Sequence, residues 1–211
     1  MAFGSVWRNE MVIFIEGGSA ENGKINADFR RAWSKFFQNA GITNVPKIVI
    51  SGSKMIVKFS RDRRKDKVLL LDSEESIPAD RENEKMKVFD KFLFNIKKRS
   101  DWCDDENIYD EQIHFMVACM ESWFMADMET LQKYYGKFFA GEHFNWDDVE
   151  IIARNKIMDA LKKATKNTKK GTYHKTKHAP EILQNLNSSV VCSKAFFCDR
   201  LFEYLKMTSA K

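Results

Sequence analysis

Three short apolar runs in the first third of the chain constrain its fold most strongly. They are Met11–Ile15, Pro46–Ser51 and Val68–Leu71. Such runs are typical of strands that are buried on both faces, as in parallel sheets. Between the first two runs, Asn26–Ala40 places aromatic residues three and four positions apart, and Gly41 follows, which predicts an amphipathic helix with a C-terminal stop. Strand, helix and strand in this order predict a βαβ unit with parallel strands.

In the rest of the chain, predicted strands and helices alternate less regularly. Lys54–Phe59 has the alternation of a strand, but two parallel strands need a crossover between them, so we expect a helix there. Asn83–Lys98 has a helical period, and Gln112–Ala118 is a fourth apolar segment. Further helical periods cover Met120–Asp127, Thr130–Tyr135, Val149–Leu161, Pro180–Leu186 and Lys194–Leu205. We therefore expect an α/β fold with a mainly parallel sheet of about four strands flanked by helices. The core would span residues 1–140, and a helical portion over 141–211 would pack on it.

Composition and hydropathy exclude several classes of protein. With 9 glycines and 3 prolines in 211 residues, the chain is neither collagen-like nor proline-rich. Its apolar runs are far shorter than the roughly 20 residues that a membrane-spanning helix needs. The first residues, Met1–Glu10, lack the apolar stretch of a signal peptide. We therefore expect a soluble, cytoplasmic protein.

Positive charge is concentrated in one segment. The net charge is +5, yet residues 161–178 contain seven lysines and no acid, and a second basic run covers Lys58–Lys67. Clustered lysines suit contact with a nucleic-acid backbone without reading its sequence, whereas the plainer interpretation is a solvated loop. In the first interpretation Tyr173 stacks on a base while the lysines follow the backbone. The candidate contacts in this lysine-rich loop are Lys170, Tyr173, Lys175, Lys177 and His178.

Acidic residues follow two of the predicted strands at their carboxyl ends. Glu16 ends the first run, and Asp72 and Glu74 follow the third. The carboxyl ends of parallel strands meet at one edge of a sheet, and carboxylates that gather there repel one another unless a cation neutralises them. Mg²⁺ or Mn²⁺ suits such a site, and two-metal sites of this kind cleave phosphodiesters. In the alternative interpretation, these acids only begin solvated loops. Arg30, on the first predicted helix, either faces this edge and holds a phosphate or is solvated.

These two acidic motifs resemble a known domain. An apolar strand that ends in Glu-Gly, with a later apolar strand that ends in Asp-x-Glu, is similar to the Toprim domain of topoisomerases, primases and OLD-type nucleases. The resemblance implies that Glu16 acts in acid/base or metal chemistry and that Asp72 and Glu74 bind magnesium. The second motif departs from the commoner Asp-x-Asp, and because Glu reaches one methylene farther, the metal geometry can differ.

Longer segments extend the resemblance. The strings IFIEGG, LLLDSEE, DEQIHFMVACMESWFMAD, KKGTYHKTKHAPEIL and CDRLFEYL resemble a bacterial family of unknown function that is classed as Toprim-like, over about residues 10–206. Its members are short proteins, often encoded beside an ABC/AAA-type ATPase in presumed phage-defence operons. The resemblance implies a nuclease that uses Mg²⁺ or Mn²⁺, acts on RNA or DNA, and works with such an ATPase.

Two alternatives stay open. Glu121, within MESWFMAD, is either a further metal ligand or an acid at a helix N-terminus that interacts with the helix dipole. The whole chain is either this nuclease or a non-catalytic Toprim-like module that binds an ATPase partner or nucleic acid.

Overall fold

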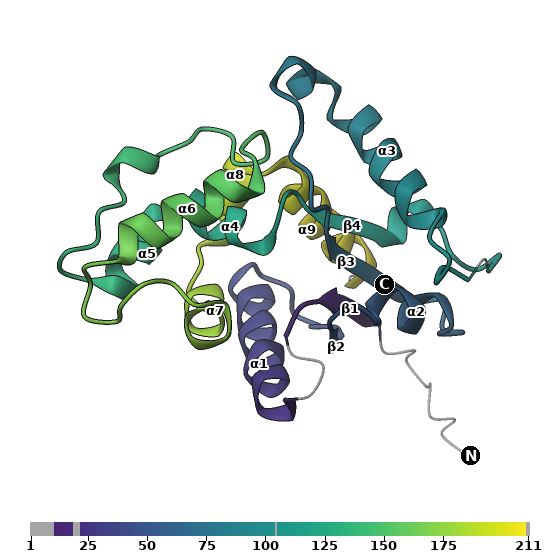
Figure 1. Cartoon of the computed structure of the whole chain (residues 1–211). Coiled ribbons are helices and arrows are strands. Elements are labelled where there is room, and N and C mark those ends of the chain that lie inside the picture. Colours follow the sequence, from purple (N-terminus) through teal and green to yellow (C-terminus); the bar gives the residue numbers. More distant parts are fainter. Residues whose placement is uncertain (1–10, 19–21, 104, 210–211) are drawn as a thin grey trace.

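The described part of the computed structural model, residues 11–18, 22–103 and 105–209, contains one sheet of four parallel strands in the order β2-β1-β3-β4 (Figure 1). The strands are β1 (Val12–Glu16), β2 (Lys47–Ser51), β3 (Lys67–Asp72) and β4 (Ile113–Met116). Helix α1 (Gly23–Asn39) connects β1 to β2, and α2 (Met55–Ser60) connects β2 to β3. The predicted α/β fold with a parallel sheet is confirmed, and so is the crossover helix between β2 and β3.

Alternate residues of the strands enter two cores, one on each face of the sheet. Ile13 and Leu70 pack in the larger core with the aromatic residues of α1. Phe14 and Leu69 pack in the smaller core with α2 and α3 (Lys85–Lys97). Figure 1 shows α1 and α3 on opposite sides of the sheet. Burial on both faces explains why these strands are continuous apolar runs in the sequence.

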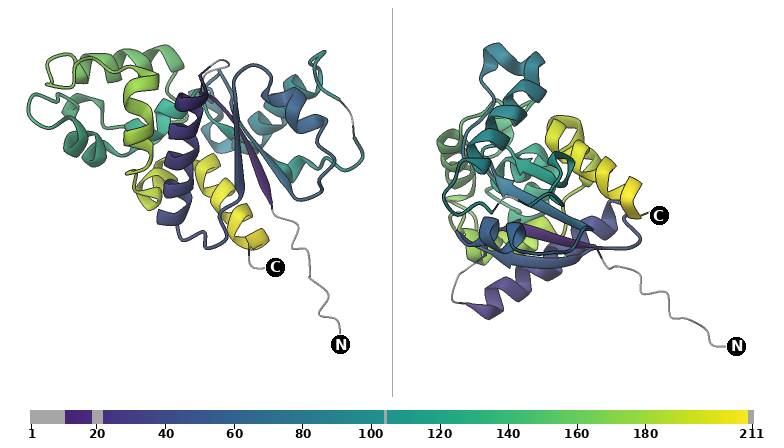
Figure 2. Two further views of the ribbon diagram at one scale, coloured as in Figure 1. Left: turned by 90° about the horizontal axis from the view of Figure 1, so that it is seen from below. Right: turned by 90° about the vertical axis from the view of Figure 1, so that its right-hand side faces the viewer.

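The chain after β4 is helical. Its helices are α4 (Met120–Ala126), α5 (Met128–Tyr135), α6 (Arg154–Thr165), α7 (Lys175–Leu183), α8 (Ser188–Lys194) and α9 (Phe196–Ser209). The described residues also form the short 3-10 helices η1 (Ala79–Glu84) and η2 (Asp110–Gln112) before β4 and η3 (Glu142–Phe144) after it. Buried residues of α4 to α9 join the larger core, and Figure 2 shows α9 beside the sheet. Among the helices described, none combines the length and the apolar character that crossing a membrane requires.

One helix begins later than the sequence predicts. The apolar period starts at Val149, but α6 starts at Arg154. The intervening backbone is used in a tertiary contact, because the carbonyl of Glu150 accepts a hydrogen bond from Ile77 N–H at 2.8 Å. The Glu150 carboxylate in turn accepts the Phe197 N–H at 2.8 Å, at the start of α9. Glu150 therefore joins three segments instead of extending α6.

Another helix begins earlier than the sequence predicts. α7 starts at Lys175, five residues before the predicted start, and Pro180 lies inside it. The second part of the predicted lysine-rich loop is therefore helical, which corrects that prediction. α8 has no apolar period that predicts it, and its N-terminus is capped by the Asn187 side chain, which accepts the Ser189 N–H at 3.1 Å.

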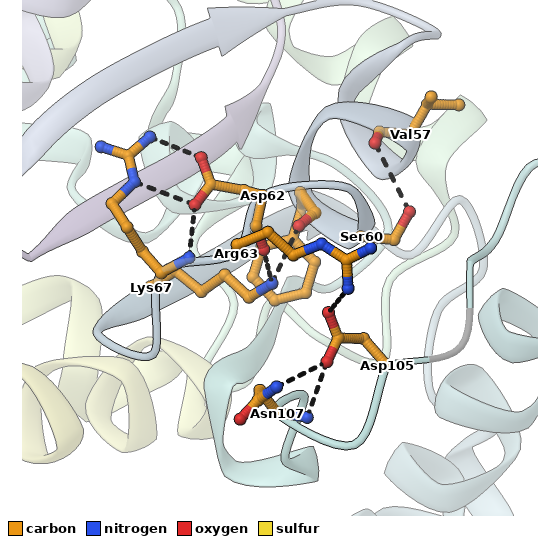
Figure 3. A network of polar contacts seen from close by, with 9 residues as sticks. Val57, Ser60, Asp62, Arg63, Lys67, Asp105 and Asn107 are labelled. Atoms are coloured by element: carbon orange, nitrogen blue, oxygen red, sulfur yellow. Dashed lines mark hydrogen bonds and ion pairs between the residues drawn. The ribbon is translucent and has the colours of Figure 1, made fainter.

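In the second basic run, Lys58–Lys67, the side chains of Arg63, Arg64 and Lys67 make contacts within the protein (Figure 3). Lys67 is 1 % exposed, and its ammonium group donates to the carbonyls of Phe59 at 3.1 Å and Asp62 at 2.5 Å. Arg63 pairs with Asp105 at 3.0 Å. Lys67 thus adds a second donor to the Phe59 carbonyl, which also accepts the Asp62 N–H at 3.1 Å, and binds the Asp62 carbonyl just beyond the end of α2.

Replacing Lys67 with methionine is expected to lower the free energy of unfolding by about 1–3 kcal/mol, because the Phe59 and Asp62 carbonyls lose the hydrogen bonds from the ammonium group. Urea denaturation measures this change. Lys65→Met is the matched control, since Lys65 is exposed, and it is expected to stay within about 0.5 kcal/mol of the wild type. Equal stability of the two variants would contradict a capping role for Lys67.

Candidate active site at the carboxyl end of the sheet

Glu16 and Asp72 end neighbouring strands of the sheet. Glu16 is the last residue of β1 and Asp72 the last residue of β3. The two strand ends lie close enough that the backbone of Asp72 acts to lower the pKa of the Glu16 carboxyl group. Beyond Glu16 the chain turns through Gly18 (φ 73°), where a Cβ would lie 2.1 Å from Asn26 Oδ1, so only glycine fits this turn. The structure therefore has these two acids at the same edge of the sheet, as the sequence predicts.

Glu121 lies behind Asp72, from the first turn of α4. It is 1 % exposed, and its Oε1 accepts a hydrogen bond from the Tyr173 hydroxyl at 2.9 Å. Lys175 Nζ lies 3.8 Å from Glu121 Oε1 and 3.8 Å from Asp72 Oδ2. Asp72 Oδ1 accepts the backbone N–H of Met120 at 2.9 Å. One ammonium group therefore stands between two buried carboxylates.

The acids crowd one another electrostatically. Burial, followed by the nearby carboxylates of Glu121 and Glu16, raises the pKa of Asp72 to about 7, although Lys175 opposes this. Burial also raises the pKa of Glu16, against the opposing charges of Lys175 and Arg99. Burial acts to lower the pKa of Lys175, but the carboxylates of Glu121 and Asp72 outweigh it and raise that pKa. Burial is thus the main reason that the ionised forms of Asp72 and Glu16 are disfavoured, and Lys175 is the cation that offsets it most strongly at Asp72.

Glu74 occupies a constrained loop after β3. Its backbone is left-handed (φ 63°), as is that of Ala118 (φ 62°) after β4, which is unusual for residues other than glycine. Ser73 connects the two loops, because its hydroxyl accepts the Ala118 N–H at 2.9 Å and donates to the Glu75 carbonyl at 2.6 Å. The Glu74 carboxylate itself forms an ion pair with Arg154 at the start of α6. Glu74 thus reaches the site, but its present partner is an arginine.

All three acids that follow the strands line one cleft. The cleft has a volume of about 300 Å³, and Glu16, Asp72 and Glu74 are among the residues that line it. Arg99, beyond the end of α3, also lines it and pairs with Asp101 at 2.9 Å. Sequence patterns alone do not identify Arg99 or Arg154 as parts of the site, because both lie far from the acidic motifs in the chain and reach them only through helix packing.

The predicted nucleic-acid contacts divide into exposed and buried residues. Lys170, Lys177 and Arg30 are exposed, and Arg30 is not among the residues that line the cleft. Tyr173 is 5 % exposed and His178 is 1 % exposed. His178 Nδ1 lies 3.2 Å from the Tyr135 hydroxyl and accepts a hydrogen bond from the backbone N–H of His174 at 3.1 Å. Neither Tyr173 nor His178 has a face open to a base, so the predicted stacking on Tyr173 is not possible in this structure.

The donor set fits a hard divalent cation in part. Mg²⁺ is usually held by one or two carboxylates and keeps several waters, and Glu16 and Asp72 provide two such carboxylates in one cleft. In the part of the chain that the structure describes, no three His, Cys, Asp or Glu side chains are grouped closely enough to hold a metal. The other two predicted ligands are engaged elsewhere: Glu74 with Arg154, and Glu121 with Tyr173 and Lys175.

The sequence model of one protein family matches residues 18–206, and this family is described as Domain of unknown function (DUF4276). The matched range starts just after Glu16 and contains Asp72, Glu121 and Lys175. No curated protein matches the chain, and no solved structure matches it.

Proposed function

The chain belongs to this family of unknown function, and from that premise we propose that it is a metal-dependent nuclease, which hydrolyses phosphodiester bonds in RNA or DNA. One observation carries the proposal: Glu16 and Asp72, from neighbouring strands, share a cleft in which burial raises the pKa of both carboxyl groups. A divalent cation relieves such crowding of negative charge and gains affinity from it.

Each polar residue of the site has a role in this proposal. Glu16 and Asp72 hold Mg²⁺ or Mn²⁺, which when bound activates water and offsets negative charge on the reacting phosphate. Lys175 provides a positive charge 3.8 Å from Asp72, and Arg154 acts electrostatically on both acids. These cations orient the phosphate and balance its charge, which is most of what phosphoryl transfer requires of a protein. Glu74 and Glu121 join as ligands only if they leave their present partners.

The Toprim relationship is part of the same proposal. The strand that ends in Glu-Gly and the strand that ends in Asp-x-Glu are neighbours in the sheet, as a shared site requires. This adjacency supports the resemblance to Toprim nucleases. By the same resemblance we propose a cytoplasmic role in anti-phage defence, with an ABC/AAA-type ATPase as the partner.

The basic edge of the protein supports a polyanionic substrate. We give this name to six exposed lysines around the end of α6 and the start of α7: Lys162, Lys163, Lys166, Lys169, Lys170 and Lys177. α7 links this edge to the site, since it also carries Lys175. A nucleic acid bound here would release counterions, so its affinity should fall steeply as salt is added.

The test is a cleavage assay on labelled single- and double-stranded RNA and DNA in Mg²⁺, Mn²⁺ or EDTA. We expect cleavage with a divalent ion and none in EDTA. Glu16→Gln is expected to reduce the cleavage rate at least about 100-fold, because removing one group that stabilises the transition state typically has an effect of this size. Glu75→Gln is the matched control, because Glu75 is exposed in the adjacent loop and pairs with Lys91 at 2.8 Å. Equal rates for the two variants would exclude Glu16 from the chemistry.

One observation favours the second candidate function, a non-catalytic module that binds nucleic acid or an ATPase. Two of the four predicted metal ligands, Glu74 and Glu121, already pair with cations of the chain itself. In that case the protein should bind nucleic acid in EDTA as tightly as in Mg²⁺. It should also cleave none of the substrates, even when the ATPase and ATP are supplied.

A further inference from the structure

The cleft has a second wall that differs chemically from the carboxylate side. This wall comes from the segment that leads into α2 and from the C-terminal half of α3 and the residues just beyond it. It combines apolar side chains with two uncharged polar groups and one guanidinium group. We call this set the α2–α3 wall, and its residues are Ser53, Met55, Ile56, Asn95, Ile96 and Arg99.

The apolar part of the α2–α3 wall is firmly anchored. Met55 and Ile56 are buried members of the smaller core, and Ile96 is half-buried and packs against that core. Met55 is 1 % exposed and Ile56 is 5 % exposed, so Ile96 is the most exposed of the three apolar side chains that line the cleft. Small-molecule sites usually combine such an apolar floor with a few convergent polar groups. A flat, uncharged ring fits this floor better than a phosphate does, because a phosphate would lose its water without gaining hydrogen bonds.

The polar part of the wall has unused hydrogen-bonding capacity. Within the described residues, the side chains of Ser53 and Asn95 have no hydrogen-bond partner in the protein, although both line the cleft. A carboxamide offers donors and an acceptor together, the pattern that the edge of a nucleobase matches. Arg99 uses its Nε and one terminal nitrogen on Asp101, at 2.9 and 3.0 Å. It still has donors for a phosphate, and its charge acts on Glu16 across the cleft.

We propose that the α2–α3 wall binds a single unpaired nucleotide of the substrate, with the base against Ile96 and Asn95 and the adjoining phosphate on Arg99. The inference rests on the proposed function and narrows its substrate class to single-stranded or unpaired nucleic acid. A volume of about 300 Å³ is at the lower end for small-molecule sites, so the cleft accepts one nucleotide and not a base pair. A base in a duplex would first have to leave the stack.

The binding test uses the full chain in EDTA and measures the binding of AMP, GMP, CMP and UMP by NMR or calorimetry. At least one nucleotide should bind in the millimolar range or more tightly. Asn95→Ala should weaken that binding about 3- to 10-fold, as expected for one hydrogen-bonding side chain. Ile96→Glu should abolish it. Lys98→Ala is the matched control, because Lys98 is exposed next to Arg99 and lies over Phe94, away from the cleft lining. Thermal melts identify any variant that has lost its fold.

The cleavage test uses one sequence presented as a single strand and as a duplex, with Mg²⁺. The single strand should be cleaved at least about 10-fold faster, and Asn95→Ala should reduce that preference. If mononucleotides bind but no substrate is cleaved, the proposed nucleotide site is retained and the proposed nuclease activity is rejected. Equal cleavage of single strand and duplex, or mononucleotide binding that neither variant changes, would overturn this site and leave the nuclease standing. Absence of mononucleotide binding at millimolar concentration would also overturn it.

Discussion

Asparagine in place of Asp72 is expected to raise the midpoint of thermal unfolding by several degrees at pH 8 and to change it little near pH 4. Burial, together with the carboxylates of Glu121 and Glu16, raises the pKa of Asp72 from 3.8 to about 7. The folded chain therefore binds this proton more tightly than the unfolded chain does, so ionisation opposes folding. The penalty is absent below pH 3.8, grows up to about pH 7 and is constant above that pH. At pH 8 it is on the order of 4 kcal/mol, and asparagine removes it.

Thermal melts of the wild type and Asp72→Asn across pH 4 to 8 measure this effect. Glu75→Gln is again the control, since an exposed carboxylate paired with Lys91 should not produce a pH-dependent difference of this size. Mg²⁺ should raise the midpoint of the wild type at pH 8 and leave that of Asp72→Asn unchanged, because the ion needs the carboxylate. A variant that melts below the wild type at pH 8 would show that the Asp72 carboxylate stabilises the fold, contrary to our interpretation.

Methionine in place of Lys175 is expected to lower the free energy of unfolding by about 1–3 kcal/mol at pH 8. The substitution keeps the apolar stem and removes the ammonium group that stands 3.8 Å from both Asp72 and Glu121. Breaking a fully buried pair costs about 3–5 kcal/mol because the remaining charge is left without a partner. The Lys175 side chain is 35 % exposed, so solvent reduces the cost here. Urea denaturation at constant pH measures it.

A second substitution tests the cause of this loss. Glu121→Gln in the Lys175→Met background should recover part of the lost stability, because it removes one of the two carboxylates and still accepts the hydrogen bond from Tyr173. Lys177→Met, two residues along α7 at an exposed position, is the matched control and should be nearly neutral. If Lys175→Met and Lys177→Met are equally stable, the ammonium group is not compensating buried charge.

The strands and the helices that connect them could be predicted, because a strand that is buried on both faces is a continuous apolar run in the sequence. For the helix at 55–60, local alternation pointed to a strand, and only the need for a crossover between parallel strands indicated the helix that the structure has. The predicted start of α7 was wrong. Proline is common at the first position of a helix, so Pro180 suggested that the helix begins there, whereas Pro180 lies in the interior of α7. Local patterns thus succeeded where burial dictates them and failed at helix ends.

The site shows the same division. Glu16 and Asp72 could be paired from the sequence because each ends a strand, and parallel strands bring such ends to one edge. The partners of Glu121 could not be predicted in this way. Tyr173 lies 52 residues away in the sequence, and its contact with Glu121 depends on how α7 packs against the rest of the larger core. The buried state of Tyr173 has the same origin, since a lysine-rich neighbourhood predicts exposure.

α7 joins two regions of the protein that would otherwise respond independently. Its first residue, Lys175, balances the charge of Asp72 and Glu121, while Lys177 of the same helix belongs to the exposed basic edge. Lys175 and Lys177 are two residues apart on one helix, so the position of α7 fixes both charges together. Any displacement of α7 at the basic edge would also change the distances from the Lys175 ammonium group to Asp72 and Glu121.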